Sequence, residues 1–135
     1  MDGLNEICNI LKSSKNIAVI GISRRPFSTS RNIADYLVSI GYNVVGVNPN
    51  KSFTDADGIR VYNNLKEIPF DIDIVNVFRR SEDIPELISD ILEKKPKTVW
   101  LQQGIKNNEA VKPLEENGIV VIQDKCISVY SNYCG

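Results

Sequence analysis

The chain has 135 residues, of which 42% are hydrophobic, and this length and composition predict one domain that spans residues 1–135. It carries 16 basic and 17 acidic residues, and the formal net charge of -1 argues against a general nucleic-acid or polyanion binder. The sequence contains no histidine, which excludes Ser-His and Cys-His nucleophile pairs, His-rich zinc sites and phosphohistidine chemistry.

Short β-branched runs alternate with segments of helical period along the whole chain. In chain order, the pattern predicts a helix around residues 4–11, a strand at 17–22, a helix around 33–40, a strand at 43–47, a loop with a short extended piece at 52–65, a strand at 74–78, a helix around 84–92, a strand at 98–101, a weaker helix around 110–114 and a strand at 119–122.

The predicted strands are almost continuously apolar, which is typical of parallel strands buried on both faces. Alternation of such strands with amphipathic helices predicts the α/β class. The rules for crossover connections leave few topologies open. We therefore expect a three-layer Rossmann-like fold, in which helices cover both faces of a parallel sheet of about five strands.

The three cysteines, Cys8, Cys126 and Cys134, are odd in number and lack C-x-x-C spacing, so neither a disulfide framework nor a zinc ribbon is expected. Cys8 lies on an apolar helical stripe and is expected in the core, while Cys134 is expected to be exposed or disordered. Cys126 is expected to be a packed free thiol, beside Lys125, whose charge favours a thiolate.

No apolar run approaches the ~18 residues that a membrane span needs. The start, Met1-Asp2-Gly3, also lacks the basic and apolar regions of an export signal. With the odd cysteine count, these features predict a cytoplasmic protein without membrane contact.

Polar residues follow four of the predicted strands, at the sheet edge where open parallel sheets bind ligands. After the first strand, Gly21 permits close backbone approach, and a helix N-terminus that favours phosphate follows. The hydroxyls of Ser23, Ser28, Thr29 and Ser30 are available there, although for each of the last three a role as helix cap is preferred to ligand contact. The turn is not G-x-G-x-x-G, because Ser23 and Pro26 replace two glycines.

The second strand ends at Asn48-Pro49-Asn50-Lys51, where an NAD enzyme would carry an acidic residue. Lys51 instead suits a phosphorylated ribose, with an ordinary surface lysine as the alternative. Arg79 and Arg80 follow the third strand, and one is expected to face the cleft while the other pairs with Glu82, Asp83 or Asp71. Trp100 lies inside the fourth strand and is expected to be a core residue.

Four sequence segments carry a family resemblance: Ile-Ala-Val-Ile-Gly-Ile-Ser (17–23), Gly-Tyr-Asn-Val-Val-Gly-Val-Asn-Pro-Asn (41–50), Asp-Ile-Val-Asn-Val-Phe-Arg-Arg (73–80) and Val-Trp-Leu-Gln-Gln-Gly-Ile (99–105). Together they resemble the small stand-alone CoA-binding proteins of bacteria and archaea. These are Rossmann domains similar to the N-terminal CoA domain of the succinyl-CoA synthetase alpha subunit. The resemblance covers nearly the whole chain.

The resemblance implies a CoA site at the strand tips. The residues implied to line the CoA phosphates are Gly21, Ile22, Ser23, Arg24, Arg25, Pro26, Ser28, Thr29 and Ser30. Those implied near the phosphorylated ribose are Asn48, Pro49, Asn50 and Lys51, those that border the nucleotide are Phe78 and Arg79, and those that complete the rim are Gln102, Gln103 and Gly104. The synthetase domain has an acidic residue where Gln103 falls, so a role that needs this charge is not expected.

We therefore expect a non-catalytic protein that binds CoA or an acyl-CoA as its small-molecule partner. The synthetase's second domain, with its phosphorylated histidine, has no counterpart here, so the ligase reaction is not expected. One alternative is a redox enzyme or regulator of the same fold that binds NADP or NAD. Another is a structural or interaction protein with a vestigial site, because a fold alone does not imply activity.

Overall fold

The structure, a computed structural model that describes residues 3–135, is built on a seven-stranded sheet with strand order β3-β4-β2-β1-β5-β6-β7. Met1 and Asp2, the start of the segment considered above for an export signal, lie outside the described residues. The strands are β1 (Asn16–Ile20), β2 (Asn43–Val47), β3 (Asp55–Ala56), β4 (Ile59–Tyr62), β5 (Ile74–Val77), β6 (Thr98–Leu101) and β7 (Val120–Ile122). The helices are α1 (Leu4–Ser13), α2 (Thr29–Ser39), α3 (Ile88–Lys94), α4 (Asn108–Glu116) and α5 (Ile127–Cys134), with 3₁₀ helices η1 (Leu65–Glu67) and η2 (Ser81–Leu87).

All neighbouring strands pair in parallel except β3 and β4, which form an antiparallel hairpin. β1 lies in the middle of the sheet, with β2 on one side and β5 on the other. The chain therefore builds one half of the sheet outward through β2 and β4, then returns to β5 and builds the other half. The point at which the strand order reverses, between β1 and β5, is where ligands bind in open α/β sheets.

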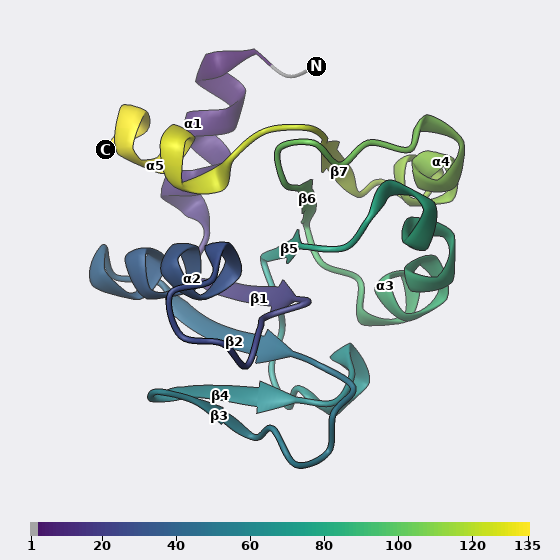
Figure 1. The fold of residues 1–135 in the computed structure, drawn as a ribbon. Coiled ribbons are helices and arrows are strands. Elements are labelled where there is room, and N and C mark those ends of the chain that lie inside the picture. Colours follow the sequence, from purple (N-terminus) through teal and green to yellow (C-terminus); the bar gives the residue numbers. More distant parts are fainter. Residues whose placement is uncertain (1–2) are drawn as a thin grey trace.

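Helices cover both faces of this sheet (Figure 1). α1, α2 and α5 lie on one face, where Leu11, Leu37 and Ile127 join the apolar core, and η2, α3 and α4 lie on the other, where Ile84, Ile91 and Leu114 do so. Because both faces are covered, the inner strands are buried along nearly their whole length. The predicted α/β fold with helices on both faces is confirmed.

The predicted loop at 52–65 contains β3, β4 and the first residue of η1, so the sheet has more strands than the five expected. β4 alternates buried and exposed residues, because it lies near the sheet edge and Gly46 and Val47 of β2 are its parallel partners. A four-residue strand with only two buried positions leaves too short an apolar pattern to predict as a main strand.

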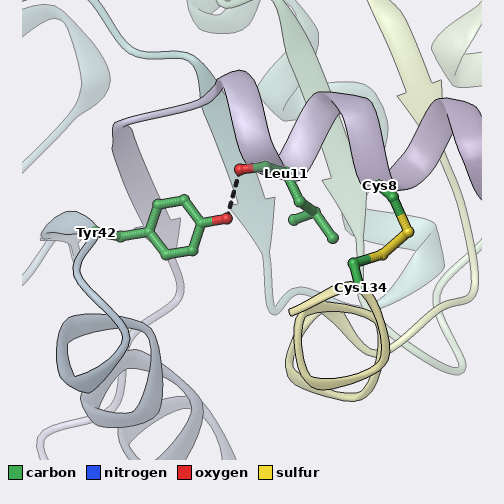
Figure 2. Close-up of a disulfide and its surroundings, with 4 residues drawn as sticks. All are labelled: Cys8, Leu11, Tyr42 and Cys134. Carbon is green, nitrogen blue, oxygen red and sulfur yellow. Dashed lines mark hydrogen bonds between the residues drawn. A yellow bond between two sulfur atoms is a disulfide. The ribbon is translucent and has the colours of Figure 1, made fainter.

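The expectation for the C-terminal tail is wrong, because residues 127–134 form α5 and Cys134 bonds to Cys8 of α1 (Figure 2). The two Cα atoms are 5.3 Å apart, although 126 positions separate them in the sequence. Cys8 is therefore half of a disulfide between the first and last helices, and not simply a small core residue. The pairing also removes the odd cysteine count as an argument for a reducing compartment.

No helix within residues 3–135 has both the length and the apolar character to cross a membrane.

Candidate functional site

Gly21 is the residue that follows β1 at the point where the strand order reverses. Its φ of 86° lies in the left-handed region, and a Cβ added there would collide with the carbonyl oxygen of Phe78. Its amide donates to the carbonyl of Val47 at 2.9 Å, and the Phe78 amide donates to that of Ile20 at 2.8 Å. The ends of β1, β2 and β5 therefore meet at a glycine that no other residue replaces without moving the backbone.

The loop after Gly21 is shaped by its own hydroxyl groups. The amide of Ser23 donates to Ser30 Oγ at 2.9 Å, and the amide of Arg25 donates to Ser23 Oγ at 3.0 Å. Ser28 is the N-cap of α2 and accepts from the amide of Arg31 at 3.4 Å, so the capping role is confirmed for this serine. The side chain of Ile22 is buried in the core. These hydrogen bonds fix the backbone conformation of the loop at the start of α2.

Arg31, which was not predicted from the sequence, holds this loop in place. It is buried, and its Nη1 donates to the carbonyls of Ser23 and Arg24 at 3.3 and 3.2 Å. Its Nη2 forms an ion pair with Asp57, which lies in the turn between β3 and β4. A charged residue two positions before the buried Ile33 and Ala34 is the signal that indicates such a role in the sequence.

The loop after β2 is tied to the first loop through Asn48. Its Nδ2 donates to the carbonyl of Ile22 at 2.8 Å, and its Oδ1 accepts from the amide of Asn50 at 2.9 Å. Asn63, also missed, donates from Nδ2 to the carbonyls of Asn48 and Asn50. Lys51 projects from this braced turn, is exposed, and forms no ion pair with any carboxylate among residues 3–135.

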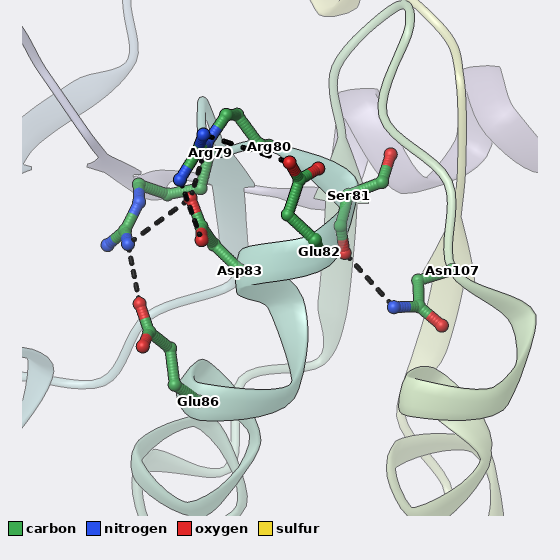
Figure 3. A network of polar contacts seen from close by, with 7 residues as sticks. All are labelled: Arg79, Arg80, Ser81, Glu82, Asp83, Glu86 and Asn107. Atoms are coloured by element: carbon green, nitrogen blue, oxygen red, sulfur yellow. Dashed lines mark hydrogen bonds and ion pairs between the residues drawn. The ribbon is translucent and has the colours of Figure 1, made fainter.

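Arg79 and Arg80 form a network of ion pairs with carboxylates of η2 (Figure 3). Arg79 Nη2 contacts Glu86 Oε1 at 2.6 Å and Asp83 Oδ2 at 3.5 Å, and Arg80 Nε contacts Asp83 Oδ2 at 3.2 Å. The hydrogen bond from Arg80 is the main reason why the pKa of Asp83 is lower than usual. Because η2 begins directly after the two arginines, its carboxylates reach both of them. The expectation that one arginine faces the cleft while the other pairs is wrong, because both pair and both line the larger cavity described below.

Two cavities lie along the carboxyl ends of the strands. The smaller, of about 440 Å³, is bounded by Gly21, Asn48 and Pro49, and the larger, of about 650 Å³, by Phe78, Gln102 and residues of α2 and η2. Both arginines line the larger cavity, and Arg79 also lines the smaller one. The cavities therefore lie on either side of Arg79, over the point where the strand order reverses.

Gln102 and Cys126 form part of the wall of the larger cavity. Gln102 is buried, and its Oε1 accepts from the Ile127 amide at 2.9 Å and from Asn76 Nδ2 at 3.2 Å. Cys126 is a free, half-buried thiol directly before α5. Burial raises the pKa of this thiol, but hydrogen bonds from Ser128, the Val129 amide and Gln102 outweigh that effect and lower it overall. The charge of Lys125 is not among the causes.

The predicted site residues divide into two groups. Those that line one of the two cavities are Gly21, Thr29, Asn48, Pro49, Phe78, Arg79, Gln102, Gln103 and Gly104. Those that lie in the adjoining loops and the start of α2 are Ile22, Ser23, Arg24, Arg25, Pro26, Ser28, Ser30, Asn50 and Lys51. Trp100 is fully buried and donates from Nε1 to the carbonyl of Lys125 at 2.8 Å, which confirms its structural role.

Known proteins resemble this chain in sequence and in fold. Residues 15–132 match the family model of the CoA binding domain. The uncharacterized protein YneT of Bacillus subtilis (strain 168) is 45% identical over 124 residues, which cover 92% of this chain and 90% of that protein.

Two solved structures are similar over nearly their whole length. The structure of cell-free ID.343 from Thermus thermophilus has a TM-score of 0.93 and 31% identity, with coverage of 98% of this chain and 99% of that one. A hypothetical protein from Pyrococcus horikoshii OT3 has a TM-score of 0.91 and 28% identity, with coverage of 98% and 92%.

Proposed function

Because the chain belongs to the family of CoA-binding domains, we propose that it binds CoA or an acyl-CoA at the carboxyl edge of its sheet, in the cytoplasm, without turnover of its own. The observation that carries this proposal is the pair of cavities on either side of Arg79. CoA has two chemically distinct halves, an adenine nucleotide with a pyrophosphate and a pantetheine arm that ends in a thiol. A ligand of that form needs two adjoining pockets and an anion site between them.

The nucleotide half suits the smaller cavity. Its wall is made by Gly21, Asn48 and Pro49, next to the loop whose backbone leads into α2. The first turn of α2 contains no acidic residue, so no carboxylate of the helix itself competes with a phosphate for the positive end of the helix dipole. The pyrophosphate would lie over residues 21–28, and the pantetheine arm would enter the larger cavity past Phe78.

Lys51 suits the phosphate on the CoA ribose. It is exposed on the turn that Asn48 and Asn63 brace, and no carboxylate among the described residues neutralises it. Arg79 is a weaker candidate for that phosphate, because Glu86 and Asp83 already pair with its guanidinium. A local cation of this kind explains how a chain of net charge -1 would hold a polyanionic ligand.

If the alternative of NADP binding is correct, the same cavities will prefer NADP to CoA. The second half of NADP is a nicotinamide nucleotide, whereas that of CoA is a flexible arm that ends in a thiol. The test has two arms. Mass spectrometry of the gently purified protein identifies a co-purifying ligand, and calorimetry compares CoA, acetyl-CoA, NAD and NADP. The proposal predicts that CoA or acetyl-CoA binds at least about tenfold more tightly than either dinucleotide, a difference of about 1.4 kcal/mol. Tighter binding of NADP, or no binding of CoA, would overturn it.

A further inference from the structure

Cys126 is the free thiol among the three cysteines, since Cys8 and Cys134 are bonded to each other. It lies at the end of the loop after β7 and lines the larger cavity together with Thr29 and Ile33 of α2. The proposed function uses this cavity to hold the pantetheine arm but gives the thiol no role.

The environment of Cys126 favours the thiolate. Its Sγ lies 3.2 Å from Ser128 Oγ, and the side chain of Gln102 and the Val129 amide are further donors that lower its pKa. Gln102 is held in one orientation, because its Oε1 accepts from the Ile127 amide and from Asn76 Nδ2. A thiolate, and not a thiol, is the nucleophile in disulfide exchange.

Asn76, which orients Gln102, is fully buried, and its Oδ1 has no hydrogen-bond partner in the described structure. Its place in β5 would suit an apolar residue, as at Ile74 on the same face. An unpaired acceptor at this depth costs stability. Asn76 therefore contributes to the orientation of Gln102 in the cavity wall and not to apolar packing of the core.

We propose that Cys126 is a thiol-exchange site that takes up CoA as a mixed disulfide from CoA disulfide. The inference rests on the proposed function, because the cavity must first bind one pantetheine arm. An arm whose nucleotide lies beyond Arg79 brings its terminal sulfur into the cavity that Cys126 lines. Binding would then hold the two sulfur centres together, which raises the rate of exchange over that of a free disulfide.

The exchange is balanced without any further reactant. The Cys126 thiol loses its proton to solvent, and the thiolate attacks one sulfur of CoA disulfide. The bond between the two CoA sulfurs breaks, a bond between Cys126 Sγ and one CoA sulfur forms, and the electron pair leaves on the second CoA thiolate, which takes up a proton. One disulfide is consumed and one is formed.

The experiment incubates the full chain, with its Cys8–Cys134 disulfide intact, with CoA disulfide or with glutathione disulfide, and follows adducts by intact-mass and peptide mass spectrometry. We expect one CoA adduct on the peptide that contains Cys126, formed at least about tenfold faster than the glutathione adduct. Desulfo-CoA, which lacks the thiol, should slow the CoA reaction by occupying the cavity. Equal rates for the two disulfides, or no adduct at Cys126, would overturn the inference.

The matched control is Cys126→Ser, which preserves the size of the side chain. It should form no adduct with either disulfide. Calorimetry of the wild type with reduced CoA separates the two proposals. If the wild type binds reduced CoA but forms no adduct, the thiol-exchange inference fails and the proposed function stands. If the wild type does not bind CoA, the proposed function fails.

Discussion

Lys51 is the cation that we propose contacts the phosphate on the CoA ribose, the group that dephospho-CoA lacks. A hydrogen bond to a charged group contributes roughly 1.5–3 kcal/mol, or about tenfold to a hundredfold in affinity. We expect the wild type to prefer CoA over dephospho-CoA by this factor, and Lys51→Ala to remove the preference while dephospho-CoA binding stays nearly constant. Calorimetry with both ligands measures it. Lys15→Ala, which removes an exposed lysine at the opposite edge of the sheet, should leave the preference unchanged.

If Lys51 is only a solvated surface lysine, the wild type will bind the two ligands equally. If the preference exists but survives Lys51→Ala, Arg79 or Arg80 is the residue responsible.

Gly21 offers a test of the backbone at the site, with Gly118 as its control. Both glycines have a left-handed φ, 86° and 81°, but an added Cβ at Gly21 would meet the carbonyl of Phe78, whereas at Gly118 nothing lies within 4 Å. Gly118→Ala should cost only the conformational strain, about 1 kcal/mol, and Gly21→Ala about 2–4 kcal/mol, because β1 and β5 must also separate. Urea unfolding gives both values. Equal losses would contradict the close approach.

Asp73 links the start of β1 to β5 and makes stability depend on pH. Burial raises the pKa of Asp73, but hydrogen bonds from the Asn16 and Lys15 amides, both at 2.9 Å, and the charge of Lys97 outweigh this and lower it. A lowered folded-state pKa stabilises the fold above the unfolded value of about 4, and this stabilisation is lost as the pH falls through the folded value.

Asp73→Asn should therefore be less stable than the wild type at pH 7 by about 1–2 kcal/mol, and the gap should shrink as the pH falls below about 4. Urea unfolding at a series of pH values measures the gap. A gap that stays constant down to pH 2, or that widens, would show that the carboxylate does not have this role.

At the scale of elements, the disulfide joins α1 to α5 and closes nearly the whole chain into one loop. In the chain-entropy account, a crosslink over 126 positions stabilises the fold by up to about 5 kcal/mol, and measured values are often lower. We expect the Cys8→Ser, Cys134→Ser double variant to unfold at a lower urea concentration, with a loss of about 2–5 kcal/mol. Reductant should lower the stability of the wild type and leave the variant unchanged. An equal response of both proteins would contradict the bond.

The elements that the sequence predicts well are those with continuous apolar character. The strand at 43–47 and the strand at 98–101 have their predicted bounds, because buried parallel strands need no polar alternation. α5 was not predicted, because Ser128, Ser131 and Asn132 interrupt its apolar stripe and its burial depends on contact with α1 and α2. The disulfide follows from the same contact, which is invisible without the topology.

The carboxyl edge of the sheet was predictable because its position follows from the strand order, and Gly21, Asn48 and Arg79 border the cavities there. The supports of the site were not predictable. Arg31 acts through a turn between β3 and β4 that was expected to be a loop, and Asn63 braces a chain segment thirteen to fifteen positions away. Such partners are set by the tertiary structure and carry no local pattern.

At the scale of the whole molecule, the two edges of the sheet differ in construction. At the amino edge, the first and last helices are joined by the disulfide, and the hydroxyl of Tyr42 donates to the carbonyl of Leu11 at 2.6 Å (Figure 2); a cavity of about 540 Å³ beside Lys15 and Tyr42 lies there too. The carboxyl edge carries the two cavities, on loops that contact one another around Gly21.

Binding of CoA at the carboxyl edge is tested most directly by amide chemical shifts in a titration of the ¹⁵N-labelled protein with CoA. We expect the largest changes at the carboxyl edge, at Gly21, Asn48, Phe78 and Gly104, while Gly41 and Gly118 at the amino edge stay nearly unmoved. Saturable changes confined to the amino edge, or no changes at CoA concentrations in the millimolar range, about −4 kcal/mol of binding free energy, would contradict it.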